Sequence, residues 1–401
     1  MGVKGLFLLV LFASSALLGQ ASLRSKGSTC TPKSAGDISI DDVPAIREAL
    51  SACGNGGTIV IPAGETFMIR TPLEFTGCHN CDFQIEGTLK VSDDLEYWED
   101  KKAFFLLENI VGATLHSLTG SGLIDGSGQK YWDYFAHNST FQRPFLIYLG
   151  NASDIIFTKH RWINPAFWFS YINGSSTNVK FIDLVLTAIS TSKSLPKNTD
   201  GFDTGYSSHV TFSNIYVNNG DDCIAFKSGS TDITVNNITC IGSHGISVGS
   251  LGAEPGIPHI VKNVYISDVK MINSTFGTRI KFYPGGPSHG PVSVTNVTYK
   301  DVTIDNCDYA FLVDNCYESE RDECRKYPSS AQLLDINFIN ITGKTSRDHD
   351  PVVAQIDCPP SGTCDLTFKD WNIVAPSGNS TVLCSNYEHP SGIKCTARVF
   401  N

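Results

Sequence analysis

The chain has 401 residues, of which 17% are charged, and its formal net charge at pH 7 is −10. This acidity argues against nucleic acid or an anionic membrane as a partner. An acidic protein would also repel an acidic substrate unless cations gather at the binding site. Apolar runs are short and β-branched, which predicts an all-β protein.

The first residues are typical of a secretory signal. Lys4 precedes an almost unbroken apolar run over 5–18, and small residues lie just before Ser22. This run is shorter than the roughly 20 residues that span a bilayer, which argues against a membrane anchor. We therefore predict a signal peptide over 1–21, a secreted extracellular protein without a membrane segment, and a single catalytic domain over 22–401.

All thirteen cysteines follow the apolar run, as expected for an oxidising compartment. Short spacings suggest six local disulfides and leave Cys307 unpaired. The candidate pairs are Cys30 with Cys53, Cys78 with Cys81, Cys223 with Cys240, Cys316 with Cys324, Cys358 with Cys364, and Cys384 with Cys395. The segment 78–81 could instead be a redox or zinc motif, but the chain has no second CxxC to support that interpretation.

Eight Asn-x-Ser/Thr sequons are candidate glycosylation sites. They begin at Asn138, Asn151, Asn173, Asn237, Asn273, Asn296, Asn340 and Asn379. Together with the secretory signal, they favour a glycosylated secreted protein of eukaryotic type.

The segment 41–50 carries the clearest helix signal. Asp41 or Asp42 can serve as N-cap, and Pro44 is tolerated in the first turn. The apolar residues of the segment share one face, and glycines end it over 54–57.

A four-residue alternation of polar and apolar residues recurs from there onward, as in Asn178-Val179-Lys180-Phe181. The other copies begin at Asp82, Asp154, His209, Asp232, Asn263, Asn296 and Asp335. From Ile155, the first apolar residues follow one another at steps of 24, 31, 23, 31, 33 and 39 residues. Short strands in units of this length predict a parallel β-helix, since a propeller blade needs four strands in about 40 residues. The helix at 41–50 would cap one end, and the cysteine-rich tail over 358–395 would close the other.

Four motifs place carboxylates, a histidine and two cations at similar intervals. They are Asn198-Thr199-Asp200, Asp221-Asp222, His244-Gly245 and Arg279-Ile280-Lys281. Asp221 lies 11 residues after the strand marker Val210, and His244 lies 11 residues after the marker Ile233. Equal offsets predict neighbouring positions on successive coils, so we expect one patch.

Crowded carboxylates raise one another's pKa, so that one can be an acid while others are bases. Hydrolysis of a glycosidic bond needs such a pair. Arg279 and Lys281 should point the same way from a strand and suit an anionic ligand. Asp221 and Asp222 should face opposite sides of an ideal strand, but Gly220 permits a kink or bulge.

In this order, the motifs resemble glycoside hydrolase family 28, the polygalacturonases, over most of the mature chain. The resemblance implies a right-handed parallel β-helix that hydrolyses α-1,4-linked galacturonic acid with inversion, without a metal or other cofactor. It implies that Asp221 is the general acid, that Asp200 and Asp222 activate water, and that His244 supports the acid. The substrate-binding residues that it implies are Asn198, Gly245, Arg279, Lys281 and Tyr317. Inversion predicts a separation of about 6.5–9.5 Å between acid and base.

The run over 242–252 is most similar to exo-polygalacturonases, which release single units from the non-reducing end. Exo action would require loops that block the cleft, and the candidates lie at 126–145, 185–197 and 316–330. The alternatives are an endo-polygalacturonase, a hydrolase of xylogalacturonan or rhamnogalacturonan, and a non-catalytic pectin-binding β-helix. Clustered carboxylates could also hold calcium, as in pectate lyases. The expected partner is pectin or polygalacturonate, and a monomer is expected.

Overall fold

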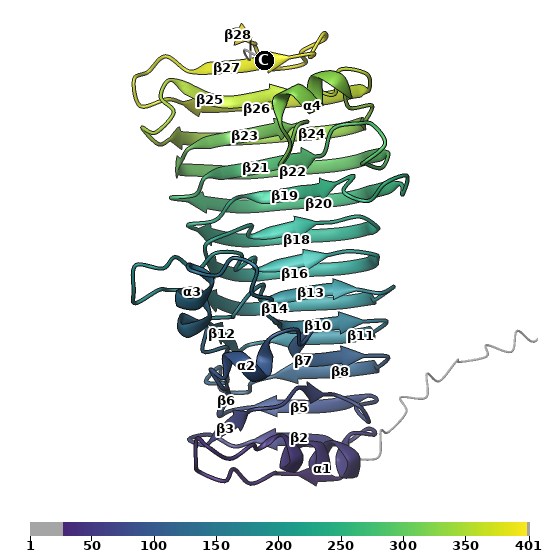
Figure 1. Ribbon diagram of the computed structural model, residues 1–401, viewed down its shortest axis with the longest axis vertical. Helices are drawn as coiled ribbons and strands as arrows, with labels where there is room; N and C mark the ends of the chain where they lie inside the picture. The colour runs from purple at the N-terminus through teal and green to yellow at the C-terminus, as the bar shows by residue number, and fades with distance from the viewer. Residues whose placement is uncertain (1–26, 399–401) are drawn as a thin grey trace, which may run out of the picture.

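The computed structural model describes residues 27–398, so the predicted signal peptide lies outside the described residues. The chain winds into a right-handed parallel β-helix whose coils stack along one long axis (Figure 1). This confirms the predicted fold class. Within the described range, no helix has the length and apolar character needed to cross a membrane.

Two long parallel sheets run the length of the solenoid. The 12-stranded sheet consists of β4 (Leu73–Glu74), β7 (Ala103–Glu108), β10 (Phe145–Gly150), β13 (Ser170–Asn173), β15 (Phe202–Thr204), β17 (Ile224–Phe226), β19 (Ile246–Leu251), β21 (Phe276–Phe282), β23 (Tyr309–Asp314), β25 (Val352–Asp357), β27 (Thr381–Ser385) and β28 (Ala397–Arg398). The 16-stranded sheet follows the path β1 (Thr29–Cys30), β2 (Thr58–Ile61), β5 (Cys81–Ile85), β8 (Val111–His116), β11 (Ser153–Thr158), β14 (Thr177–Thr187), β16 (Ser207–Asn218), β18 (Ser230–Ile241), β20 (His259–Ile272), β22 (Val292–Cys307), β24 (Gln332–Thr345) and β26 (Thr363–Val374). Beside this path lie β3 (Thr66–Ile69), β6 (Thr88–Val91), β9 (Leu123–Asp125) and β12 (Arg161–Ile163).

The predicted strand markers pair with one another in an unbroken row. Ile155 pairs with Val179, and the row continues through Val210, Ile233, Val264, Val297 and Ile336. The polar residue before each of these markers has a positive φ, which Asn and Asp tolerate better than most residues. The recurrent Asn or Asp therefore marks a bend in each coil.

The prediction that one copy of the repeat begins at Asp82 is wrong by two residues, since that copy begins at Asn80. The residue that continues the row before β11 is Cys81, since Cys81 pairs with Ala113 and Ala113 pairs with Ile155. Asn80, not Asp82, is the positive-φ residue there. Buried and less buried residues alternate along the whole of β5, so the alternation alone cannot show which buried residue continues the row.

Aromatic side chains fill the solenoid interior in stacks. Phe157, Phe181 and Phe212 stack with centroids 5.0 Å and 5.3 Å apart. These distances are close to the spacing of about 4.8 Å between paired strands. Identical residues on successive coils therefore pack face to face and form a continuous buried core.

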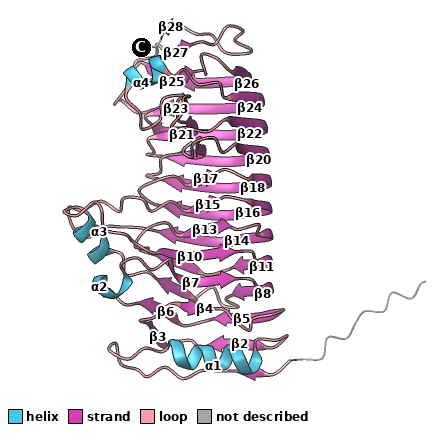
Figure 2. Ribbon diagram, turned by 45° about the vertical axis from the view of Figure 1, so that its right-hand side comes forward, coloured by secondary structure: helices cyan, strands magenta, loops and turns pink. Residues whose placement is uncertain are grey.

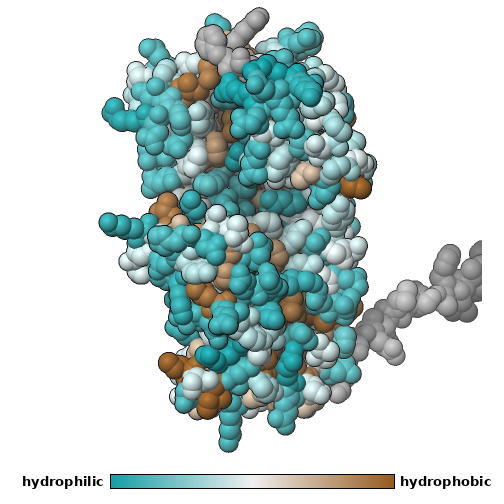
Figure 3. Space-filling view, viewed as in Figure 1, coloured by the Kyte–Doolittle hydropathy of each residue, from teal (hydrophilic) through white to brown (hydrophobic). Residues whose placement is uncertain are grey.

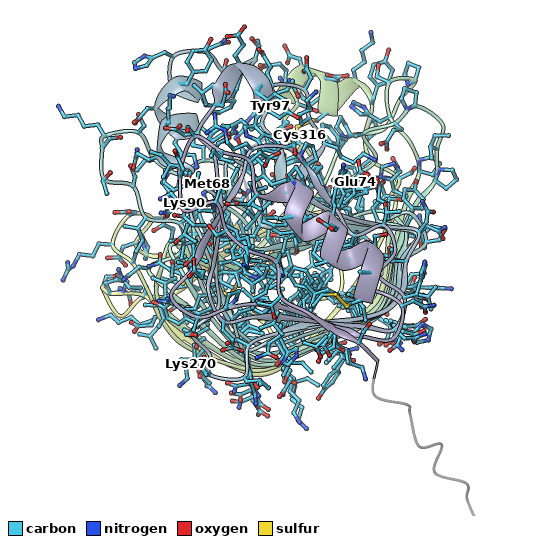
Figure 4. The ribbon with its side chains drawn as sticks, turned by 90° about the horizontal axis from the view of Figure 1, so that it is seen from below. Met68, Glu74, Lys90, Tyr97, Lys270 and Cys316 are labelled. Atoms are coloured by element: carbon cyan, nitrogen blue, oxygen red, sulfur yellow. A yellow bond between two sulfur atoms is a disulfide. The ribbon has the colours of Figure 1, made fainter. Side chains whose placement is uncertain are left out.

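The predicted capping helix is α1 (Val43–Cys53), which lies across the amino-terminal end of the coils (Figures 2 and 4). Asp42 occupies the N-cap position, but its side chain does not cap the helix. Its carboxylate instead accepts bonds from the amides of Ala35 and Met68, both at 2.7 Å. The cap thus ties the helix to the first coil.

All six disulfides predicted from the short spacings are present. They join Cys30 to Cys53, Cys78 to Cys81, Cys223 to Cys240, Cys316 to Cys324, Cys358 to Cys364, and Cys384 to Cys395. The bond between Cys78 and Cys81 argues against a zinc motif at 78–81, because both thiols are already used. Both cysteines are also buried, which argues against a redox motif. Cys307 is free, as predicted, and it is buried.

Three short helices lie on one side of the solenoid (Figure 2). They are α2 (Leu95–Trp98), α3 (Gln129–Phe135) and α4 (Arg321–Lys326). Figure 4 shows Tyr97 and Cys316 on that side and Lys270 on the opposite side. The insertions that carry these helices therefore border one face of the molecule.

Candidate active site

The four motifs meet on the outward face of the 12-stranded sheet. Asp200 precedes β15, Asp221 and Asp222 precede β17, and His244 precedes β19, while Arg279 lies within β21. These strands are consecutive neighbours in the sheet. The sequence pattern therefore becomes a single patch, as predicted from the spacing.

Asp200, Asp221 and Asp222 form what we call the carboxylate cluster. One oxygen from each lies within 4.8 Å of the other two. This is shorter than the 6.5–9.5 Å expected between the acid and base of an inverting enzyme. The close approach arises because these residues lie in bends before adjacent strands, and adjacent strands run less than 5 Å apart.

Asp221 points toward His244, and their Oδ1 and Nδ1 atoms are 3.2 Å apart. The equal offsets from the strand markers predicted that Asp221 and His244 occupy equivalent positions, and this prediction is wrong by one residue. On this sheet Phe202 pairs with Ile224 and Ile224 pairs with Ile246, so the step is 22 residues and Asp222 lies level with His244. The markers belong to the other sheet, and the turns between the two sheets differ in length.

A bend explains how Asp221 and Asp222 both take part in the cluster. The pair lies before β17 rather than within it, so strand alternation does not apply. Asp221 accepts the amide of Asp222 on its own Oδ1 at 2.8 Å. At Gly220, a Cβ would lie 2.6 Å from the carbonyl oxygen of Pro196, so the close approach requires glycine.

Asp222 is fully buried, and its position is fixed by two bonds. Ser247 donates to Oδ1 at 2.7 Å, and the ammonium of Lys281 donates to Oδ2 at 2.7 Å. Lys281 is itself only 4% exposed. The two bonds therefore hold the Asp222 side chain in one position against the sheet.

The environments of Asp200 and Asp221 push their pKa values apart. Burial and the neighbouring carboxylate of Asp221 raise the pKa of Asp200 well above its usual range. Burial also acts to raise the pKa of Asp221, but hydrogen bonding to His244 and its positive charge outweigh burial and lower that pKa to about 2. Burial opposes ionisation of His244, yet the bond to Asp221 raises its pKa. Asp200 and His244 therefore hold their protons more tightly than the free side chains do, and Asp221 holds its proton less tightly.

Tyr317 lies over the two cations of the β21 motif. Its ring centroid is 5.1 Å from the guanidinium carbon of Arg279 and 5.1 Å from Nζ of Lys281. The disulfide between Cys316 and Cys324 closes the loop that carries this tyrosine. Three of the five predicted substrate-binding residues, Arg279, Lys281 and Tyr317, thus lie together on one side of the cluster.

Gly245 takes part in the site through its backbone alone. Its φ is 110°, a value that favours glycine, and its carbonyl oxygen accepts the amide of Cys223 at 2.8 Å. The residue predicted to bind substrate therefore holds the bend beside His244.

Arg143 is a site residue that the sequence analysis missed. Its guanidinium donates to Oδ1 of Asn198 at 2.8 Å, and the amide nitrogen of Asn198 lies 3.3 Å from Oδ2 of Asp221. The same guanidinium lies 3.6 Å over the ring of Phe135 in α3. Burial lowers its pKa to about 10, against the attraction of Asp200 and Asp221. A single arginine between Gln and Pro carries no motif, so no sequence signal pointed to it.

A second missed pair is Asp203 and Lys227, whose Oδ1 and Nζ atoms are 3.2 Å apart. Asp203 is completely buried and lies three residues after Asp200. Burial raises its pKa to about 7, although Lys227 opposes that shift. A signal was present, since Asp203 closely follows the first motif on a strand of the same sheet, but the spacing argument did not use it.

Two of the three loops named as candidates for blocking the cleft, 126–145 and 185–197, contact each other. The side chain of Gln129 accepts from the amide of Thr191 at 2.7 Å and donates to Oγ of Ser192 at 3.0 Å. The third loop carries α4 and borders a hollow of about 410 Å³ beyond Asp314 and Asp357. On the face seen in Figure 3, most of the surface is hydrophilic and hydrophobic residues form separate patches.

The sequence model of glycosyl hydrolases family 28 matches residues 53–395. The endo-xylogalacturonan hydrolase A of Aspergillus tubingensis is 47% identical over 370 residues, which is 92% of this chain and 91% of that protein. The crystal structure of endo-xylogalacturonan hydrolase from Aspergillus tubingensis superposes with a TM-score of 0.91, covering 92% of this chain and 99% of that one. A polygalacturonase from Erwinia carotovora ssp. carotovora, 21% identical, shares the fold with a TM-score of 0.70 over 89% of this chain and 97% of that one.

Proposed function

Because this chain belongs to family 28 of the glycosyl hydrolases, we propose that it is a secreted endo-acting hydrolase of xylose-substituted galacturonan in pectin. The observation that carries the proposal is the 47% identity, over 92% of the chain, to a protein named for that activity. Family membership confirms the prediction of a glycoside hydrolase. Among the functions predicted from sequence, the comparisons favour the xylogalacturonan alternative over exo-polygalacturonase.

Endo action agrees with the position of the carboxylate cluster on the sheet. On one side of it the 12-stranded sheet continues through β13, β10 and β7, and on the other side through β23, β25 and β27. A polysaccharide that lies along this face can extend in both directions from the cut bond. An exo enzyme would need one of these directions closed.

We assign the acid proton to the Asp221–His244 pair. His244, whose pKa is raised, supplies the proton through Asp221 to the leaving glycosidic oxygen. Asp222 accepts a proton from the attacking water, and protonated Asp200 holds that water by a hydrogen bond. Water's oxygen bonds to the anomeric carbon as the glycosidic bond breaks, and solvent then returns the proton from Asp222 to the acid pair.

The resemblance to the family implies inversion, and we retain that assignment for this chain. Both oxygens of Asp222 are already bonded, one to Ser247 and one to Lys281. These bonds fix the carboxylate against the sheet and keep it from moving onto the anomeric carbon, while each oxygen keeps a lone pair that can accept a proton from water. Proton NMR of the first products would show the α-anomer for retention and the β-anomer for inversion.

Secretion is supported by the six disulfides, which need an oxidising compartment. The polysaccharide is the proposed partner, and we propose a monomer with one catalytic domain. The catalytic assignment uses no metal: the Lys281 ammonium already neutralises Asp222 within the carboxylate cluster.

The deciding experiment compares early products from three polymers: xylogalacturonan, the same polymer after removal of xylose, and rhamnogalacturonan. We expect a spread of oligomers and the highest rate on the xylose-bearing polymer. Release of single galacturonic acid units alone would contradict endo action. Equal or greater rates on the stripped polymer would contradict the proposed substrate, and unsaturated ends would indicate a lyase instead of a hydrolase.

A further inference from the structure

Five aromatic side chains lie beside the carboxylate cluster on its amino-terminal side. We call them the aromatic platform: Phe145, Tyr148, Phe167, Trp168 and Tyr171. They come from β10, β13 and the turn before β13, and each is partly exposed. Ring centroids within this group are 5.1 Å to 6.2 Å apart. None of the motifs that define the proposed reaction includes them.

Two glycines let the tyrosine rings lie along the sheet. A Cβ at Gly150 would lie 2.8 Å from the ring of Tyr148, and a Cβ at Gly205 would lie 3.0 Å from the hydroxyl of Tyr171. Each tyrosine ring therefore lies over a glycine, at a position where any other side chain would push the ring away from the sheet. A ring that lies along the sheet leaves one face accessible to a ligand, whereas a ring perpendicular to the sheet would present mainly its edge.

The platform is continuous with the reacting groups. Tyr148 pairs with Tyr171, and Tyr171 pairs with Asp203, so the three outward positions form one row. Lys227, bonded to Asp203, lies 5.1 Å from the ring of Trp168. A sugar chain that leaves the cluster in this direction meets the aromatic rings next.

Three cations lie over rings of the platform, Lys102, Arg143 and Lys227, and two of them are paired with carboxylates. Lys102 lies 4.7 Å over the ring of Tyr148 and 2.8 Å from Glu108, and Lys227 pairs with Asp203. Lys102 and Lys227, the cations beside Tyr148 and Trp168, are thus neutralised by carboxylates that would repel a galacturonate carboxylate. Arg143, 5.0 Å from the ring of Phe167, is buried and donates to backbone carbonyls and to Asn198. Apolar faces without net charge suit a sugar ring that carries none.

We propose that the aromatic platform binds an uncharged sugar ring, the pentose branch carried by the galacturonan chain, by stacking on Trp168 and the two tyrosines. The inference rests on the proposed function and names where the branch is held. The platform would then contribute to substrate affinity. Its presence should lower KM for the branched substrate and have little effect on kcat.

The test measures kcat and KM for Trp168→Ala and Tyr148→Ala on xylogalacturonan and on the same polymer stripped of xylose. We expect about a 10-fold rise in KM on the branched polymer, equivalent to about 1.4 kcal/mol, and little change on the stripped one. Trp168→Phe should recover most of the loss. The matched control is Tyr265→Ala, an exposed tyrosine of the other sheet that should change neither value.

Equal loss on both polymers would overturn the proposal, because the rings would then bind the galacturonan backbone. Unchanged KM on both would overturn it as well. A failure of the proposed function looks different, since the wild-type chain would then show no preference for the branched polymer. In that case, the platform is tested directly by calorimetric titration of Asp221→Asn, with and without the added substitution Tyr148→Ala, with xylose-bearing and bare oligogalacturonates. A preference of Asp221→Asn for the xylose-bearing ligand that is lost in the double variant supports the proposal. Equal binding of the two ligands by Asp221→Asn overturns it.

Discussion

On one side of the carboxylate cluster the sheet presents Tyr148 and Tyr171, and on the other side it presents Arg279 and Lys281. Both flanks consist of outward-facing side chains on the same sheet, so the difference between them comes from the side chains and not from the backbone. The cationic flank is bonded directly to the cluster, since Lys281 reaches Asp222 at 2.7 Å. The aromatic flank contacts it indirectly, through Asp203 and Lys227 and through Arg143 and Asn198. We therefore expect the cationic flank to govern turnover and stability, and the aromatic flank to govern affinity.

The largest expected effect lies at the boundary between the flanks. Asp221→Asn removes the group that passes the proton to the leaving oxygen, so kcat should fall by about 10²–10⁴-fold while KM changes little. An oligogalacturonate with a dinitrophenyl leaving group needs no acid and should be cut by the variant at a rate near that of the wild type. Unchanged kcat on polymer would remove Asp221 from the acid role, and loss on both substrates would assign it to the water instead.

Breaking the cationic flank should affect folding as well as turnover. Lys281→Met leaves the fully buried Asp222 without its partner, so the free energy of unfolding should fall by about 3–5 kcal/mol. Arg47→Met is the matched control, because its ion pair with Glu74 is about half exposed. That variant should lose at most about 1 kcal/mol. Urea denaturation measures both, and equal losses would contradict the distinction.

Arg143 links the aromatic side to the cluster through Asn198. Arg143→Met removes a buried charged donor to Asn198, so its amide can turn and its bond to Asp221 is lost. A hydrogen bond from a charged group contributes about 1.5–3 kcal/mol, and kcat should fall by about 10–100-fold with KM nearly unchanged. Gln142→Ala, the exposed neighbour, is the control. A rise in KM alone would place Arg143 in binding and not in positioning.

The last prediction concerns pH. Burial raises the pKa of Asp203 to about 7 from an ordinary value of 3.8. The folded chain then binds more protons than the unfolded chain between these values, so stability falls as pH rises from about 4 through 7. Asp203→Asn cannot titrate and should flatten the decline of melting temperature over this range. A decline of the same slope in the variant would show that Asp200 alone causes it.

The fold was predictable because the same local constraint recurs on each coil. A residue that tolerates positive φ followed by alternating polar and apolar residues marks a bend and a strand with one buried face. The register between coils was predictable for the same reason from Ile155 onward. It failed at Cys81 because alternation looks the same after a shift of two residues.

The site was predictable where its residues form short motifs, and not where they act through distant contacts. Asp200, Asp221 and His244 repeat at intervals close to one coil. Arg143 reaches the cluster from another coil, and nothing in its neighbourhood in sequence marks that contact. Lys227 lies on the coil of Asp222, directly after β17, at a position that the spacing argument did not use. The separation of the carboxylates also could not be predicted, because it depends on bends that interrupt the strands.

The disulfides have a consequence for how the chain is made. The paired cysteines are separated by 23, 3, 17, 8, 6 and 11 residues in chain order. Each bond thus closes within one coil or between neighbours, and no bond waits for a distant part of the chain. Oxidation can therefore keep pace with synthesis from the amino terminus, with few opportunities for mispairing. Cys307, the odd thiol, is shielded from exchange as soon as its coil is covered.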